Sequence, residues 1–172
     1  MEIFCAKDSS GCMQEDIRLM LLRMEEIGLL MEFPEGFYQM EDEKRRRCYP
    51  WKGRPDIILE NPDGVRLTGQ KTGQKIEVSE IVPAVEAARE LTENNFPQYS
   101  FSPVYLHERG ELPIGWFQMK MSDREMEHIK VFSVIHKEMI MTTFTYPSAE
   151  EIKWKSMILY SFGTWRESHG EN

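Results

Sequence analysis

The chain has 172 residues, of which 41% are hydrophobic and 29% are charged, a composition typical of a folded globular protein rather than a disordered one. Its formal net charge is −8, and its one basic run, Lys44 to Arg47, directly follows the acidic residues 41–43. Because nucleic-acid binding depends on neutralising phosphates, this charge argues against DNA or RNA as the main partner. No stretch reaches the ~18 apolar residues of a membrane span.

The N-terminal residues and the cysteines indicate a protein of a reducing compartment. Residues 1–12 lack the basic start, apolar middle and cleavage site of a signal peptide, so we expect a cytoplasmic location. Cys5, Cys12 and Cys48 are odd in number and form no CxxC pair. We therefore expect free thiols, no zinc site and no cofactor.

In the first third of the chain, the apolar spacing predicts a helix followed by strands. Apolar residues at positions 17, 20, 21, 24 and 27 follow a helical stripe and predict a helix over Gln14–Ile27, which Gly28 would end. The segments that follow read, in order, as a strand over 29–33, a turn over 34–36, a short helix over 41–47 and a strand over 56–60.

A turn and a short repeat come next. Asn61-Pro62-Asp63-Gly64 is a strong turn signal, because proline presets φ and glycine accepts a positive φ. Residues 65–70 should then return as the partner strand. The sequence Thr-Gly-Gln-Lys at 68–71 is repeated at 72–75, and two such short copies predict a flexible hairpin tip.

The second half contains two further helices separated by strands. Ser79 can cap a helix whose inner face carries Val85, Ala88 and Leu91. The strands predicted after it span 99–107, 114–121, 127–135 and 139–146, and residues 136–138 join the last two as a hairpin. The final helix begins with a capping box, Ser148 and Glu151, and buries a stripe formed by Trp154, Ile158, Phe162 and Trp165.

This order of elements predicts an α+β fold. Short connections between successive strands require antiparallel pairing, so we expect a twisted antiparallel sheet with helices packed on both faces. We divide the chain into an N-terminal helical extension over residues 1–28 and a single α+β domain over residues 29–172.

Two segments carry a resemblance to a known family. The strand ending in Phe33-Pro34-Glu35-Gly36-Phe37, and the segment 141–147 followed by a helix with Trp154, Ile158, Ser161 and Phe162, resemble PsbP/DcrB-like domains. The resemblance implies an antiparallel sheet between helices, an α/β/α sandwich, and mostly non-enzymatic roles in binding proteins or supporting assemblies. It supplies no catalytic residues.

Residue patterns for catalysis are sparse. The chain has no GxSxG elbow and no HExxH motif, and Cys48 follows three arginines without a histidine placed beside it. Asp123, Glu125, Glu127 and His128 cluster in one polar connection, which could bind a hard cation or serve acid–base chemistry. A solvated turn between strands explains the same cluster, and we favour that interpretation.

Two surface features remain as candidate contacts. The segment 45–54 combines arginines with aromatic side chains, the residue types enriched in binding hot spots. The alternative is that Tyr49 and Trp51 merely plug the edge of the sheet. Trp116 could be an exposed contact or could lie beneath a helix. We therefore predict a non-catalytic cytoplasmic binding or accessory protein; the alternatives are a small metal-dependent hydrolase and an immunity-type protein that neutralises a basic effector. The possible partner surface consists of Arg45, Arg47, Tyr49, Trp51 and Arg54.

Overall fold

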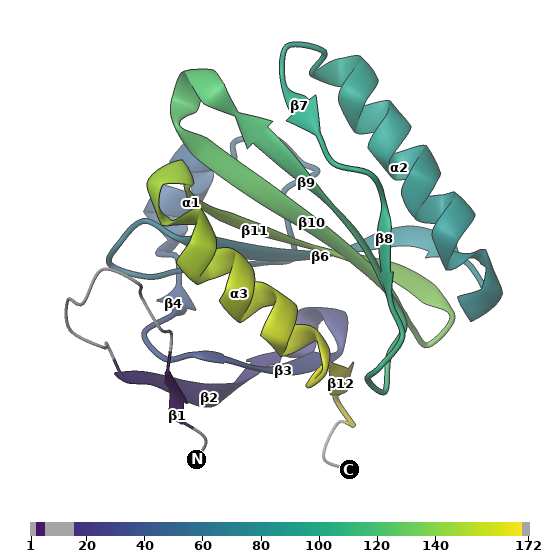
Figure 1. The fold of residues 1–172 in the computed structure, drawn as a ribbon, viewed down its shortest axis with the longest axis horizontal. Coiled ribbons are helices and arrows are strands. Elements are labelled where there is room, and N and C mark those ends of the chain that lie inside the picture. The colour runs from purple at the N-terminus through teal and green to yellow at the C-terminus, as the bar shows by residue number, and fades with distance from the viewer. Residues whose placement is uncertain (1–2, 6–15, 170–172) are drawn as a thin grey trace.

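The computed structural model describes residues 3–5 and 16–169, and in this part antiparallel strands form two sheets against which three α-helices pack (Figure 1). The predicted α+β fold with an antiparallel sheet is confirmed. In spatial order, the large sheet contains β4 (Tyr38–Gln39), β5 (Ile57–Glu60), β6 (Arg66–Lys75), β11 (Glu138–Pro147), β10 (Met126–Ile135), β9 (Ile114–Met121) and β7 (Ser100–Phe101), and β8 (Tyr105–His107) also pairs with β9.

The small sheet lies below the large one in Figure 1 and holds residues from both ends of the chain. Its strands, in order, are β1 (Ile3–Cys5), β2 (Asp16–Met24), β3 (Leu29–Pro34) and β12 (Arg166–Glu167). The helices are α1 (Asp42–Cys48), α2 (Ile81–Asn95) and α3 (Glu151–Phe162), with short 3-10 helices at Glu25–Ile27, Val78–Glu80, Ser122–Arg124 and Ser148–Glu150.

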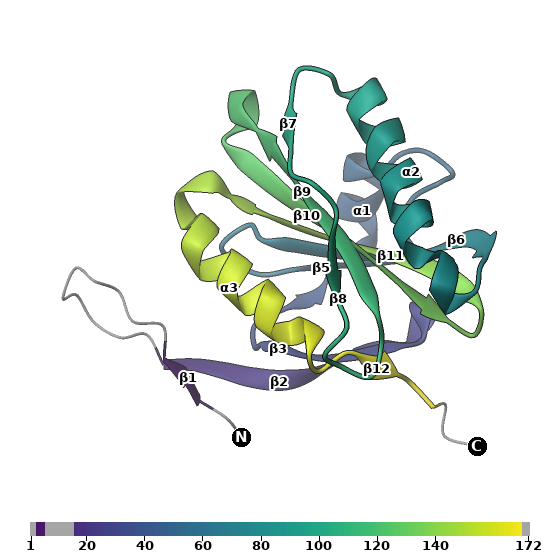
Figure 2. The ribbon, with the colours of Figure 1, turned by 45° about the vertical axis from the view of Figure 1, so that its right-hand side comes forward.

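Helices cover both faces of the large sheet, as the sequence predicted. Side chains alternate along a strand, so neighbours in β10 point to opposite sides. Phe132 belongs to the same buried cluster as Val85 of α2 on one side, whereas Ile129 and Val131 belong to the cluster that contains Trp154 of α3 on the other. In Figure 2, α2 and α3 lie on opposite sides of β9 and β10.

The small sheet and α3 share one core with the large sheet. Phe33 of β3 is fully buried, and its ring centroid lies 5.3 Å from that of Phe144 and 6.3 Å from that of Trp154. Trp165, directly after α3, is also fully buried, with its ring 5.7 Å from Phe162. The predicted burial of Trp154, Ile158, Phe162 and Trp165 is confirmed, although Trp165 lies beyond the C-terminal end of α3.

Both predicted turns of the large sheet are confirmed. Asn61 Oδ1 accepts hydrogen bonds from the backbone N–H groups of Asp63 and Val65, and Gly64 has a φ of 82°. The β10–β11 hairpin closes at His136 and Lys137, whose φ values of 52° and 61° fit the two-residue turns that match strand twist. β10 and β11 lie in the centre of the large sheet, between β6 and β9.

The helix predicted over Gln14–Ile27 is wrong; Gln14 itself lies outside the described residues. Residues 16–24 form β2, which pairs with β3 from Leu19 to Met24, and a 3-10 helix follows. Residues 17–24 are apolar except for two arginines, so a period of 2 fits them as well as a period of 3.6. The partner strand decides between the two, and Met24 and Ile27 are buried in the same core as residues after Gly28.

The flexible hairpin tip predicted at residues 68–75 is also wrong. This segment is the outer part of β6, which pairs with β11 as far as Lys75. Gly69 is required by packing rather than by a turn, because a Cβ there would lie 2.7 Å from Met24 Cε and 2.8 Å from Ile27 Cδ1. The glycine lets the chain after β2 approach the sheet closely.

Three local predictions need correction. The single strand expected over 99–107 is two short strands, β7 and β8, which pair with different parts of β9 on either side of Pro103. Leu91 is 63% exposed rather than on the inner face of α2. Ser148 lies in a 3-10 helix and caps nothing, and α3 begins at Glu151, whose side chain reaches the sheet instead.

Candidate functional site

The predicted partner residues lie on α1 and on the loop that leads from it to β5. We call Arg45, Arg47, Tyr49, Trp51 and Arg54 the α1 surface. The rings of Tyr49 and Trp51 meet edge to face with centroids 5.7 Å apart. Trp51 remains 54% exposed and Arg47 is exposed, whereas Arg45, Tyr49 and Arg54 are half-buried. The structure thus gathers a large aromatic side chain and several cations on one outer segment.

A buried carboxylate fixes α1 to the sheet. Lys44 Nζ lies 2.9 Å and 2.8 Å from the two carboxylate oxygens of Glu60, which is 5% exposed. Arg66 Nε lies 4.0 Å from the same carboxylate and its guanidinium donates to Cys48 Sγ at 3.9 Å. Because these pairs join the start and the end of α1 to β5 and β6, the helix presents the α1 surface on a rigid support.

The carboxylate–histidine cluster predicted at Asp123–His128 does not converge. Asp123 lies in the 3-10 turn that precedes β10, and Glu125 adopts a φ of 52° at its end. Glu127 and His128 are consecutive in β10, so they point to opposite faces of the sheet. Within residues 3–5 and 16–169, no three His, Cys, Asp or Glu side chains gather as metal ligands.

The structure instead brings Glu127 into a buried polar network that the sequence did not predict. Gln118 Nε2 lies 3.0 Å from Tyr146 Oη, 3.1 Å from Glu151 Oε1 and 3.3 Å from Glu127 Oε1. Lys120 Nζ lies 3.4 Å from Glu151 Oε1 and 3.6 Å from Glu127 Oε1. The network joins β9, β10 and β11 to the first residue of α3, and only the three-dimensional pairing could reveal it.

The pKa values of the two carboxyl groups of this network are shifted in opposite directions. Burial, followed by the nearby charge of Glu151, raises the pKa of Glu127, and its Oε2 atom is buried without a hydrogen-bond partner. Burial also acts to raise the pKa of Glu151, but the hydrogen bond from Gln118 and the charge of Lys120 outweigh it and lower that pKa. Such a divergent pair is found in acid–base sites and in structural networks alike.

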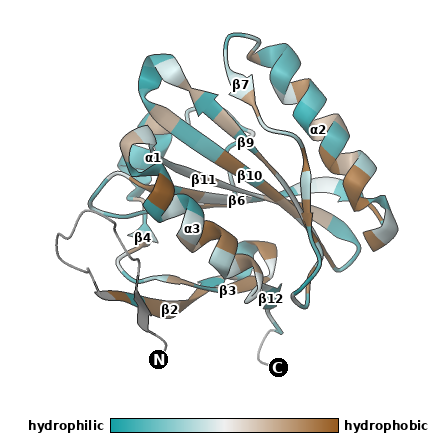
Figure 3. Cartoon of the chain, in the orientation of Figure 1, coloured by the Kyte–Doolittle hydropathy of each residue, from teal (hydrophilic) through white to brown (hydrophobic). Residues whose placement is uncertain are grey.

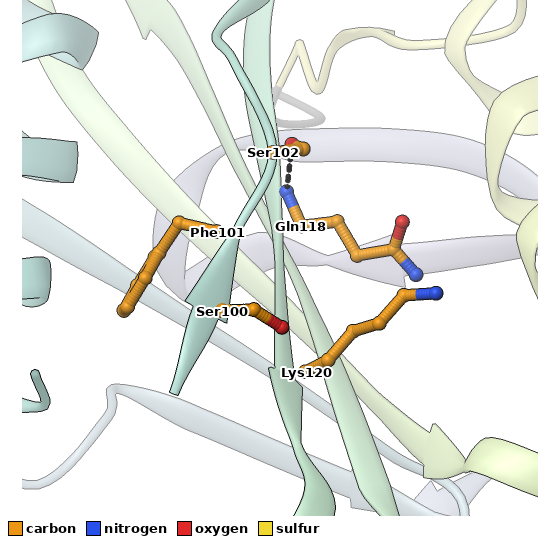
Figure 4. A pocket seen from close by; sticks show the side chains of 5 residues that line it. All are labelled: Ser100, Phe101, Ser102, Gln118 and Lys120. Atoms are coloured by element: carbon orange, nitrogen blue, oxygen red, sulfur yellow. Dashed lines mark hydrogen bonds between the residues drawn. The ribbon is translucent and has the colours of Figure 1, made fainter. Parts of the chain in front are cut away.

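A small pocket lies beside the network, between β7 and β9. It encloses about 190 Å³ and is lined by Ser100, Phe101, Ser102, Gln118 and Lys120 (Figure 4). The ring of Phe101 points away from Gln118 and Lys120, and the Ser102 hydroxyl accepts a hydrogen bond from the Gln118 backbone N–H. Small-molecule sites usually span about 300–1,000 Å³, so the network fits the role of a tie between α3 and the sheet better than that of a substrate site.

Two other sequence candidates are placed by the structure. Trp116 is 8% exposed and lies beneath α3, with its ring 6.0 Å from that of Phe162, so it belongs to the core. Cys48 is a free thiol that accepts a hydrogen bond from Arg66. Cys12 lies outside the described residues.

Comparison with known proteins shows the fold. No family model and no curated protein matches the chain. The solution structure of cyanobacterial PsbP (CyanoP) from Synechocystis sp. PCC 6803 matches with a TM-score of 0.60 and 8% identity, covering 94% of this chain and 97% of that one. A crystal structure from Bacteroides thetaiotaomicron VPI-5482 has a TM-score of 0.45 and 15% identity, covering 83% of this chain and 46% of that one. No helix in the described part of the chain is long and apolar enough to cross a membrane. The match to cyanobacterial PsbP shows that the chain has a PsbP-like fold, in agreement with the resemblance found in its sequence.

Proposed function

We propose that this protein is a non-catalytic binding or accessory protein that contacts a protein partner through the α1 surface. The observation that carries the proposal is the exposure of Trp51, a large aromatic side chain that is 54% exposed on the segment after α1. Tryptophan and arginine are the residues that most often dominate binding energy at protein interfaces. The PsbP-like fold supports an accessory role, and the cytoplasmic location expected from the sequence remains part of the proposal.

The test compares two single substitutions in exposed apolar side chains. Trp51→Ala removes the centre of the α1 surface, and Ile152→Ala is the matched control, because Ile152 is 87% exposed but lies on α3. Each purified variant is used as bait in extracts of the native host, enriched proteins are quantified, and the affinity of the recovered partner is then measured with purified proteins.

We expect a partner whose enrichment depends on Trp51 and not on Ile152. Loss of a hot-spot side chain costs about 2 kcal/mol or more, which corresponds to a dissociation constant raised about 30-fold. Equal binding by the wild type and by Trp51→Ala would exclude the α1 surface as the contact.

A further inference from the structure

Among the residues that the structure describes, helices cover the two sides of the face of the large sheet opposite α3, and none lies over its middle. Residues paired directly across antiparallel strands lie on the same face. One such row runs, strand by strand, through Glu60, Arg66, Thr145, His128, Met119 and Phe101. At one end, α1 holds Glu60 through Lys44; at the other, Arg89 of α2 lies over the Phe101 ring at 5.8 Å.

The middle of this face is polar. The next row runs from Thr68 through Thr143 and Lys130 to Phe117. Gln70 begins the row after it, which continues through Met141 to Phe132, so the polar side chains lie toward β6 and β11. Most of these side chains are partly exposed, as expected for sheet residues with no helix above them. We call this region the central face; it consists of Thr68, Gln70, His128, Lys130, Thr143 and Thr145.

Lys130 is the one cation of the central face, and it has no counter-charge there. No described residue pairs its ammonium group with a carboxylate or accepts a hydrogen bond from it. Burial lowers the pKa of Lys130, because its charged ammonium group is poorly solvated there. Glu60, the acidic residue of the adjoining row, already pairs with Lys44 and Arg66.

His128 beside it supplies no negative charge either. Burial, followed by the charges of Lys130 and Arg124, lowers the pKa of His128 to about 3, so the ring is neutral at pH 7. Its Nδ1 atom lies 2.7 Å from the Thr145 hydroxyl. Lys130 lies beside the buried aromatic side chains of Phe117, its partner in β9, and Phe132. The polar side chains of the central face carry hydroxyl, amide and neutral imidazole groups, which can donate hydrogen bonds to an anion but cannot neutralise the lysine.

We propose that the central face binds an acidic segment of a protein partner, and that a carboxylate of this segment pairs with Lys130. The proposal rests on the proposed function, since it describes the chemistry of the same partner. A charged group that is partly desolvated and unpaired in the free protein gains most from an opposite charge brought by a ligand. The central face adjoins α1, whose exposed arginines would attract the same acidic segment.

The test uses a defined probe: an acetylated and amidated decapeptide of alternating Glu and Ser, with the Gln/Ser peptide as its uncharged counterpart. Binding to the full chain is followed by backbone amide shifts in NMR. Lys130→Met removes the cation, Lys130→Arg retains it, and Lys137→Met is the control, because Lys137 is 79% exposed at the distant β10–β11 turn.

We expect the Glu peptide to shift amides of β6, β10 and β11, and the Gln peptide to leave them in place. Lys130→Met should weaken binding roughly tenfold or more, whereas Lys130→Arg and Lys137→Met should not. Added salt should weaken binding as it screens the pair. Shifts confined to α1, equal affinity of Lys130→Met, or no shifts at about 5 mM peptide would each overturn the proposal.

The two proposals fail in different ways. If the native partner depends on Trp51 while the peptide binds Lys130→Met as well as the wild type, the central face is refuted and the α1 surface stands. If peptide binding depends on Lys130 while Trp51→Ala leaves the native partner unaffected, the α1 surface is refuted alone.

Discussion

His128 should make the protein less stable as the pH falls below neutrality, and replacing it should remove this effect. The folded state holds the pKa of His128 near 3, because burial and then Lys130 and Arg124 disfavour the charged ring, whereas an unfolded histidine has a pKa of 6.5. Between pH 6.5 and about pH 3, His128 is therefore protonated in the unfolded chain but not in the folded one. Stability from this residue is present above pH 6.5 and is lost as the pH falls.

The size of the effect follows from the two pKa values. Each pH unit between them costs up to about 1.4 kcal/mol, so lowering the pH from 7 to 5 removes about 2 kcal/mol of unfolding free energy through this one residue. The range above pH 5 is chosen because most carboxylates remain ionised there in both states.

The assay is urea denaturation at pH 7, 6 and 5 for the wild type and two variants. His128→Asn keeps a polar partner for Thr145 but cannot gain a proton. His136→Asn is the control, because its side chain is 70% exposed in the β10–β11 turn. We expect the difference in unfolding free energy between the wild type and His128→Asn to change by about 2 kcal/mol over this range.

Parallel pH profiles for the wild type and His128→Asn would refute this reasoning. So would an NMR titration in which the His128 ring gains its proton near pH 6.5. In Lys130→Met, the pKa of His128 should rise, because a nearby positive charge is removed.

Three further changes test the packing and the buried network. Gly115→Ala should destabilise the fold by about 1–3 kcal/mol, because the new Cβ would lie 2.8 Å from Val85 Cγ2; Val85→Ala in the same chain should relieve part of this loss in a double-mutant cycle. Trp165→Ala should cost about 3–5 kcal/mol of unfolding free energy in urea titrations, and a smaller loss would show that the sheets are held together elsewhere. Glu127→Gln should stabilise the protein more at pH 7 than at pH 4, because the raised pKa of Glu127 means that its ionisation costs the folded state stability as the pH rises. Calorimetry of the wild type and the variant measures this, and an equal difference between them at both pH values would contradict it.

The sequence was sufficient wherever local chemistry decides the structure. The Asn61–Gly64 turn, the helix after Glu41, the β10–β11 hairpin and the buried aromatic stripe from Trp154 to Trp165 were all predicted. In each of these, the side chains involved lie close in the sequence and favour one backbone conformation. The order of such elements also led to the PsbP-like fold.

The sequence failed where a distant partner selects between two patterns. Residues 17–24 suit a helix or a strand equally, and only pairing with β3 makes them β2. The glycines at positions 69 and 73 are typical of a flexible hairpin tip, but pairing with β11 makes this segment part of strand β6. A glycine is needed at position 69 because Met24 and Ile27 pack against it. A side chain's face depends on register, which a single segment does not contain.

The candidate sites show the same division. The partner surface was predicted from residue types alone, and its role stays a prediction. Two of its residues, Arg45 and Arg47, lie on α1, and Tyr49, Trp51 and Arg54 follow in the loop after it. Glu127 and His128 appeared to form a cluster in the sequence, but side chains alternate along β10. Glu127 therefore lies on the face of Gln118, and His128 lies on the opposite face with Lys130. Sequence determined which chemical groups the chain carries; the pairing of strands distant in sequence decided which of them meet.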